Sequence, residues 1–133
     1  MLKLSIIDAN LNRAREGLRV VEDIERFYFK SGKFADLRKL RHRLAALFAD
    51  DYENLVKSRD VARDKGAAIS EKGRKDISSA LRANIARAGE ALRVIEEITK
   101  LKNVEKSGRV KRIRFRLYEI EKDFVIKLCK QKN

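Results

Sequence analysis

The sequence predicts an all-α protein: a duplicated helical hairpin that forms an antiparallel four-helix bundle with pseudo-two-fold symmetry. Three observations lead to this class. The 133 residues contain no proline and only six glycines, whereas sandwiches and barrels need many turn residues. Apolar residues recur with a period of about 3.6 residues in four long stretches. The chain also repeats part of its own sequence, which is typical of a duplicated unit.

Each of the four stretches has one apolar face and is expected to be a helix. They are about Ile7–Lys30, Phe34–Lys57, Asp76–Leu101 and a fourth that follows Ser107-Gly108. The polar segment 58–74 contains two glycines and is expected to be a long, mostly irregular loop. We therefore expect a single domain over residues 1–133, with internal repeats at about 5–57 and 76–131.

The repeat is the most informative feature of the sequence. Residues 8–24 align without a gap on residues 82–98, an offset of 74 (82 minus 8), and ten of the seventeen pairs are identical. The segment Leu40-Arg-His-Arg-Leu44 also matches Ile113-Arg-Phe-Arg-Leu117, at an offset of 73. Two matches in the same order predict two similar hairpins, with the first and third helices close together. The duplicated apolar faces also suggest a homodimer.

Polar residues that recur on the apolar face of both halves are the first candidate site. They are Asn10, Arg13 and Glu16 in one half and Asn84, Arg87 and Glu90 in the other. Such groups are costly there unless each finds a partner. Two interpretations stay open: a structural polar seam between the halves, or the floor of a cleft in which arginines hold phosphate oxygens. Gly17 and Ala91 lie on the same stripe, which predicts open space above it.

Under the cleft interpretation Arg13, Arg87 and Asp60 are the catalytic candidates. The substrate- or nucleotide-binding candidates are Asn10, Glu16, Arg41, Arg59, Asn84, Glu90 and Arg114. The central segment Ser58–Ser70 contributes Asp60 and Asp64, four residues apart beside arginines. These two carboxylates are the candidate ligands of Mg²⁺; the alternative is that they only pair with Arg59 and Arg63. Because there is one long loop, we expect the two halves to differ in function.

Composition limits the remaining classes. Neither glycine-rich nucleotide motif is present, and one histidine and one cysteine exclude a zinc cluster. His42 aligns with Phe115, which predicts an aromatic packing position. The single Cys129 cannot form an internal disulfide, which favours a cytoplasmic protein, and no apolar run is long enough to span a membrane. The net charge of +13 attracts polyanions, so the alternative function is a basic, non-catalytic helical module that binds nucleic acid. Against it, the nine phenylalanines and tyrosines occupy mostly apolar positions.

Several motifs occur in one order along the chain: the segment Ile7–Asp23, Leu40-Arg-His42, Arg59-Asp-Val61 with Asp64 and Gly66, and the segment Ala83–Glu97. In these motifs the sequence resembles the small all-helical domain often fused ahead of thiamin-phosphate synthase, a family of hydroxymethylpyrimidine-phosphate kinases. The resemblance covers nearly the whole chain, and without a fused synthase the chain resembles a stand-alone version. It implies that ATP and Mg²⁺ are used to convert hydroxymethylpyrimidine phosphate to its diphosphate, with thiamin-phosphate synthase as a pathway partner.

Overall fold

The computed structural model describes residues 2–131, and within that range it contains helices and no strand. Four long helices carry the fold: α1 (Leu2–Asp23), α2 (Phe34–Leu47), α4 (Ile77–Thr99) and α5 (Val104–Gln131). A short helix, α3 (Tyr52–Lys57), follows α2. The predicted all-α class is therefore confirmed.

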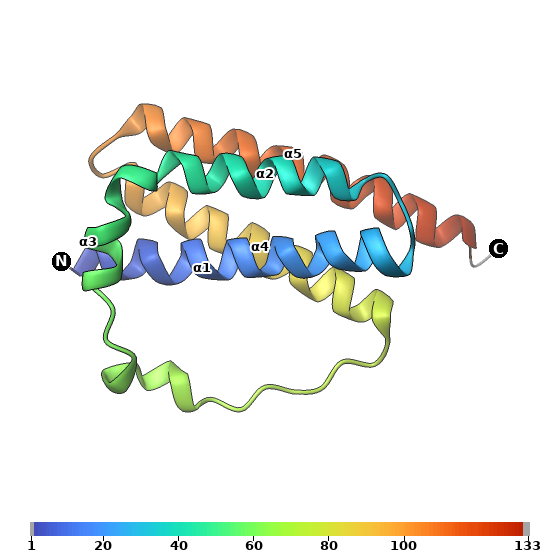
Figure 1. Ribbon diagram of the computed structural model, residues 1–133, viewed down its shortest axis with the longest axis horizontal. Coiled ribbons are helices and arrows are strands. Elements are labelled where there is room, and N and C mark those ends of the chain that lie inside the picture. The colour runs from blue at the N-terminus through green and yellow to red at the C-terminus, as the bar shows by residue number, and fades with distance from the viewer. Residues whose placement is uncertain (1, 132–133) are drawn as a thin grey trace.

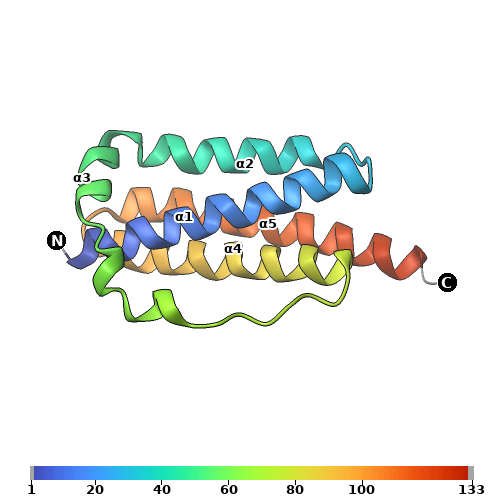
Figure 2. The same cartoon turned by 60° about the horizontal axis from the view of Figure 1, so that its bottom comes forward.

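The four long helices form a bundle in which neighbours run antiparallel (Figure 1). Helix α1 packs most extensively against α4 and also against α2, while α5 packs against α4 and α2. The expected closeness of the first and third predicted helices is thus confirmed. The connection between α3 and α4 leads the chain from one end of the bundle back to the other, alongside α1 and α4 (Figure 2).

A single core runs along the bundle, built from apolar residues three or four positions apart on each helix. Leu18, Leu44, Leu92 and Leu117, one from each long helix, have no exposed surface. Burying each such side chain contributes roughly 1.5–3 kcal/mol. The apolar period that predicted the helices therefore also selects the faces that meet in the core.

Two helix boundaries differ from the sequence prediction. The second predicted helix, 34–57, is interrupted: α2 ends at Leu47, a short turn covers Ala49–Asp51, and α3 begins at Tyr52. The Ser107-Gly108 pair does not precede the last helix but lies inside it. Ser107 is buried, and its Oγ donates a hydrogen bond to the Glu96 carbonyl at 2.8 Å. The serine therefore satisfies a backbone acceptor in the last turns of α4 instead of breaking α5.

The end of α1 is also irregular. The helix widens into a π-helical turn over Ile24–Tyr28, and Lys30 has a φ of 53°. The chain reverses there before α2. A left-handed conformation is uncommon for a residue with a side chain, so the positive φ of Lys30 marks the point where the chain turns.

The segment from residue 58 to Asp76 is mostly irregular, as expected, with two short 3-10 turns at Val61–Arg63 and Lys65–Ala68. It ends at Asp76, whose carboxylate accepts a hydrogen bond from the Ser79 backbone N–H at 2.7 Å and caps α4. This hydrogen bond holds the pKa of Asp76 below its ordinary value. The cap fixes where α4 begins.

The aromatic residues correct one expectation. Five of the nine are exposed, with exposed fractions between 45% and 65%: Phe27, Tyr28, Tyr52, Phe115 and Tyr118. His42 is exposed as well, so neither His42 nor Phe115 fills an internal packing position. A helix face can present aromatic residues to solvent at the same spacing that would bury them. Across residues 2–131, no helix is both long and apolar enough for a membrane span.

Candidate functional site: the groove between α1 and α4

Four of the predicted site residues meet in one surface groove of about 300 Å³ between α1 and α4. Asn10 and Arg13 come from α1, and Arg87 and Glu90 come from α4, with Ala91 and Val94 completing the lining. The two repeats therefore contribute residues to one shared groove. The antiparallel crossing of α1 and α4 produces this arrangement, because it brings equivalent positions of the two repeats face to face.

The amide nitrogen of each of the two asparagines donates a hydrogen bond to a carbonyl of its own helix. Asn10 Nδ2 donates to the Ile6 carbonyl at 2.9 Å, and Asn84 Nδ2 donates to the Ala80 carbonyl at 2.8 Å. Asn10 is buried and Asn84 partly buried. Their side-chain oxygens are thus left to neighbouring donors. This matched bonding fixes the orientation of each amide on its own helix.

The two arginines are exposed at the rim of the groove, not within the apolar face as the angular position predicted. Arg13 Nη1 lies 3.4 Å from Asn10 Oδ1, and Arg87 Nη1 lies 3.4 Å from Glu71 Oε2 in the long connection. Each guanidinium carries five N–H donors, so both keep donors that face outward. Two such arginines in one groove suit an anion with several oxygens.

A polar seam between the repeats is not formed among residues 2–131. No ion pair within 4.0 Å or hydrogen bond joins the Asn–Arg–Glu set of one helix to that of the other in the described contacts. Glu16 is exposed and is not part of the groove lining. Gly17 is closed off as well, since a Cβ built there would lie 3.0 Å from the Asn84 carbonyl oxygen. The expected open space above Gly17 is therefore wrong; this glycine lets α1 and α4 approach each other.

The structure does not bring Arg41 and Arg114 to the groove. Arg41 Nε donates to the buried Glu22 at 2.8 Å, and Arg114 Nε donates to the buried Glu96 at 2.7 Å. Each pair is bidentate, because a second guanidinium nitrogen lies 3.3 Å from the same carboxylate. A bidentate arginine–carboxylate pair between neighbouring helices fixes their relative position. Both arginines are thus engaged inside the hairpins.

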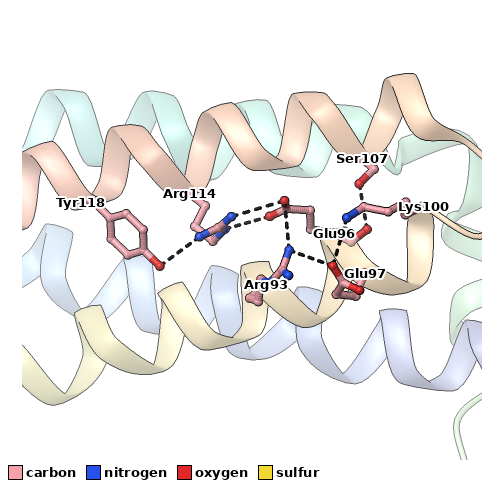
Figure 3. A network of polar contacts seen from close by, with 7 residues as sticks. All are labelled: Arg93, Glu96, Glu97, Lys100, Ser107, Arg114 and Tyr118. Carbon is pink, nitrogen blue, oxygen red and sulfur yellow. Dashed lines mark hydrogen bonds and ion pairs between the residues drawn. The ribbon is translucent and has the colours of Figure 1, made fainter.

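The Glu96 pair belongs to a larger network between α4 and α5 (Figure 3). Arg93 donates to Glu96 at 3.3 Å, and Arg114 Nη1 donates to the Tyr118 hydroxyl at 3.1 Å. The hydrogen bonds to Glu96 hold the pKa of Arg114 above its ordinary value. Glu22 and Glu96 are equivalent repeat positions, as are Arg41 and Arg114. These matched contacts agree with the internal repeat, although duplication and pseudo-two-fold symmetry stay a prediction.

The central segment is fastened to α1 at its start. Arg59 donates from Nε and Nη2 to the carboxylate of Asp8 at 2.6 and 3.0 Å, and Ser5 Oγ donates to the Ser58 carbonyl at 2.8 Å. Asp8 is buried and Arg59 exposed. The hydrogen bonds that Arg59 donates to Asp8 raise the pKa of Arg59. Sequence reasoning missed Asp8, whose only signal was its place in the Ile7–Asp23 motif, because its repeat partner is Arg82.

Asp60 and Asp64 each accept a backbone hydrogen bond in a short turn. Asp60 Oδ1 accepts from the Arg63 N–H at 3.3 Å, and Asp64 Oδ1 accepts from the Gly66 N–H at 2.9 Å. Both side chains are exposed. In the described part of the chain, no three His, Cys, Asp or Glu side chains gather as a metal site. Mg²⁺ commonly takes only one or two carboxylates together with substrate phosphates, and hard oxygen donors of this kind fit that role.

Comparison with known proteins identifies the family of this chain. The model of the ThiD2 family matches residues 5–123. The chain belongs to the ThiD2 family. It is 42% identical over 120 residues to thiamine-phosphate synthases of Synechocystis sp. and Nostoc sp., which covers 87% of this chain in each case. It is 41% identical over 123 residues, 90% of its length, to the thiamine-phosphate synthase of Prochlorococcus marinus strain AS9601.

The chain spans about a third of the length of these curated relatives, 34% of the Synechocystis protein and 33% of the Nostoc protein. It is therefore similar to one part of each. No solved structure matches the chain. The resemblance drawn from the motifs, to a small helical domain that accompanies thiamin-phosphate synthase, is confirmed by the family and by these partial matches.

Proposed function

We propose that this protein is a phosphotransferase that uses ATP and Mg²⁺ to phosphorylate hydroxymethylpyrimidine phosphate to the diphosphate. Membership of the ThiD2 family and the likeness to thiamine-phosphate synthases support a role in thiamin biosynthesis. Thiamin-phosphate synthase is then the pathway partner, and the reaction takes place in the cytoplasm. The observation that carries the proposal within the fold is the pair Arg13 and Arg87, exposed together in one groove.

The proposed chemistry needs cations more than a base. A phosphate monoester has a second pKa of about 6 and is largely dianionic at neutral pH. One of its oxygens attacks the γ-phosphorus of ATP, the new P–O–P bond forms, and the bond to ADP breaks with ADP as the leaving group. Arg13 and Arg87 would hold the phosphate oxygens and offset the charge of the moving group. In this proposal Asn10 and Asn84 orient the ligand beside them.

The long connection would complete the site. Arg87 already contacts Glu71 from this segment at 3.4 Å, so the connection reaches one of the two groove arginines. Asp60 and Asp64 are the residues that would hold Mg²⁺ together with the substrate phosphates. When bound there, the ion would offset part of the charge of the substrate phosphates.

A nucleic-acid-binding module remains the second candidate. The five exposed aromatic residues favour it, although the sequence pattern had predicted that most aromatic residues would be buried. Exposed aromatic rings can stack on bases, and the net charge is +13. However, the exposed rings are spread over the α1–α2 turn, α3 and α5. They do not line the arginine groove, so no single stacking platform is joined to it.

A coupled ATP-consumption assay with hydroxymethylpyrimidine phosphate tests the proposal. We expect ADP release that requires the pyrimidine phosphate and Mg²⁺ and changes little with moderate salt. The same preparation is titrated with single-stranded RNA at increasing salt. Absence of turnover with phosphorylated pyrimidines, together with RNA binding whose affinity falls steeply with salt, would replace the kinase with the nucleic-acid module.

A further inference from the structure

The end of the bundle where α1 begins and α4 ends contains a second hollow, of about 400 Å³. We call it the lysine pocket and define it by Lys3, Phe48, Asp51, Thr99, Lys102 and Lys106. Aliphatic side chains, among them Ile7 and Ile98, complete its lining. None of the arginines assigned to the groove lies in it. A volume of this size fits a small organic ligand, since such pockets measure roughly 300–1,000 Å³.

The charges of the lysine pocket do not balance. Lys106 is engaged: its Nζ lies 3.1 Å from Asp51 Oδ2 and 4.3 Å from the centre of the Phe48 ring. Lys3 and Lys102 are exposed and have no acidic partner within 4.0 Å among residues 2–131. Three lysines against one aspartate leave two positive charges. A phosphate monoester carries between about −1.5 and −2 at neutral pH and would balance them.

Thr99, which lines the pocket, carries a buried hydroxyl without a partner. The residue is only 6% exposed, and its Oγ1 has no hydrogen-bond partner in the described structure. Leaving a buried hydroxyl unpaired costs about 1–3 kcal/mol, and native proteins rarely do so. A ligand atom that accepts from or donates to this hydroxyl would remove that cost.

The opposite end of the bundle provides a contrast. Glu25 is the repeat partner of Thr99 at the offset of 74, and its Oε2 is also buried without a partner. There Phe29, Phe124 and Leu128 close the space, and a cavity of only about 10 Å³ remains. The two ends thus share a buried polar position, but only the Thr99 end is open to a ligand.

The body of the ligand must be apolar and flat on at least one side. The buried Phe48 ring and the side chains of Ile7 and Ile98 form a wall below the lysines. Phe48 is only 5% exposed and Lys106 Nζ lies 4.3 Å from the centre of its ring, so Phe48 adds apolar surface without a free face for stacking. The wall therefore suits the apolar body of a ring, with the charged group held at the lysine rim.

We propose that the lysine pocket binds a phosphate attached to a heteroaromatic ring. Two ligands share this chemistry, the pyrimidine phosphate and the adenine nucleotide. These two are taken from the proposed function, and the inference rests on that function only in naming them. The pocket is next to the groove: Asn10 lies three residues after Ile7 on α1, and Val94 four residues before Ile98 on α4. These spacings amount to about one helical turn, roughly 5 Å. A ligand held here would therefore lie within reach of Arg13.

The test is a titration of the full chain with ¹³C-labelled isoleucine methyl groups, followed by NMR. The probes are hydroxymethylpyrimidine phosphate, ATP and inorganic phosphate, each added separately. We expect saturable shifts of Ile7 and Ile98 with one of the two ring phosphates, and no shift of Ile120, which is buried in the core. Inorganic phosphate should bind at least about ten-fold more weakly, because it lacks the ring.

Variants distinguish binding in the lysine pocket from non-specific attraction to the positive charge of the protein. The double variant Lys3→Gln/Lys102→Gln should weaken binding of the ring phosphate by about ten-fold or more. Lys122→Gln is the matched control, since Lys122 is exposed on α5 outside the pocket, and it should bind like the wild type. Thr99→Val keeps the side-chain shape and should weaken binding while leaving the free energy of unfolding unchanged or higher, because it removes the unpaired hydroxyl.

Three outcomes would overturn the inference: no shift of Ile7 and Ile98 with either ring phosphate, equal affinity for inorganic phosphate, or unchanged binding in the double lysine variant. Each is distinguishable from failure of the proposed function. Turnover without shifts at Ile7 and Ile98 would refute the lysine pocket and leave the kinase in place. Saturable, lysine-dependent shifts without turnover would support the pocket and refute the kinase.

Discussion

Gly17 is the residue through which α1 approaches α4, and replacing it with alanine should destabilise the protein. A Cβ at this position would lie 3.0 Å from the Asn84 carbonyl oxygen and 3.5 Å from the Ala88 Cβ. The nearer atom belongs to the backbone of α4, so the helix axis itself must move. Alanine gains about 1 kcal/mol in helix propensity over glycine, whereas overpacking costs about 1–3 kcal/mol. We expect a net loss of about 1 kcal/mol in the free energy of unfolding.

Gly89 is the matched control on α4. A Cβ there would meet only a ring carbon of Tyr118, at 3.7 Å, which is an ordinary contact. Gly89→Ala should therefore stabilise the protein by up to about 1 kcal/mol. Both variants are measured by urea unfolding followed by circular dichroism. If Gly17→Ala is as stable as Gly89→Ala, or more stable, the close crossing of α1 and α4 described above is wrong.

Three further predictions concern the groove arginines, the Arg114–Glu96 ion pair and the buried Glu25. Arg13→Ala and Arg87→Ala should each lower kcat/KM by about a hundredfold or more. Their unfolding free energies should stay within about 0.5 kcal/mol of the wild type. If instead they lose stability but keep normal activity per folded molecule, the two arginines are structural and not catalytic. Arg114→Met should lower the free energy of unfolding in urea by about 3 kcal/mol, because the buried Glu96 then keeps only Arg93 as a partner. A loss below about 0.5 kcal/mol, as is typical of exposed ion pairs, would show that the Arg114–Glu96 pair is not buried. Desolvation raises the pKa of Glu25, against smaller opposing effects of Ser31 and Lys127, so the folded state binds this proton more tightly than the unfolded state. The stability that this group contributes therefore falls as pH rises above its ordinary pKa of about 4.3. The unfolding free energy of the wild type relative to Glu25→Gln should fall as pH rises from about 4, and a difference between the two proteins that does not change with pH would refute this reasoning.

The apolar period was sufficient to predict the four long helices, because the same residues both define the helical face and fill the core. Leu18 and Leu92, at equivalent repeat positions, illustrate this, since both are completely buried. The break at Phe48 was not predicted, because Phe48 continues the apolar period while the backbone leaves the helix. The role of Ser107 was missed because the sequence does not show that its hydroxyl meets the Glu96 carbonyl of the neighbouring helix.

The candidate site was predicted residue by residue but not in its arrangement. The repeat identified Asn10, Arg13 and Arg87, yet a repeat alone does not specify how two helices cross. The crossing brings these residues into one groove and places Arg41 on the buried Glu22 instead. Helical angles assigned Arg13 to the apolar face, but a long side chain at the edge of that face extends to solvent.

The most direct test of the central claim is ³¹P NMR of the reaction of wild-type protein with ATP, Mg²⁺ and hydroxymethylpyrimidine phosphate. Phosphoryl transfer predicts that the monoester signal is replaced by two coupled signals of a new diphosphate, in equal amount to ADP. Omission of either substrate should abolish both products. ATP consumption that releases inorganic phosphate while the monoester signal stays intact, or no consumption at all, would contradict the assignment of this helical bundle as a kinase.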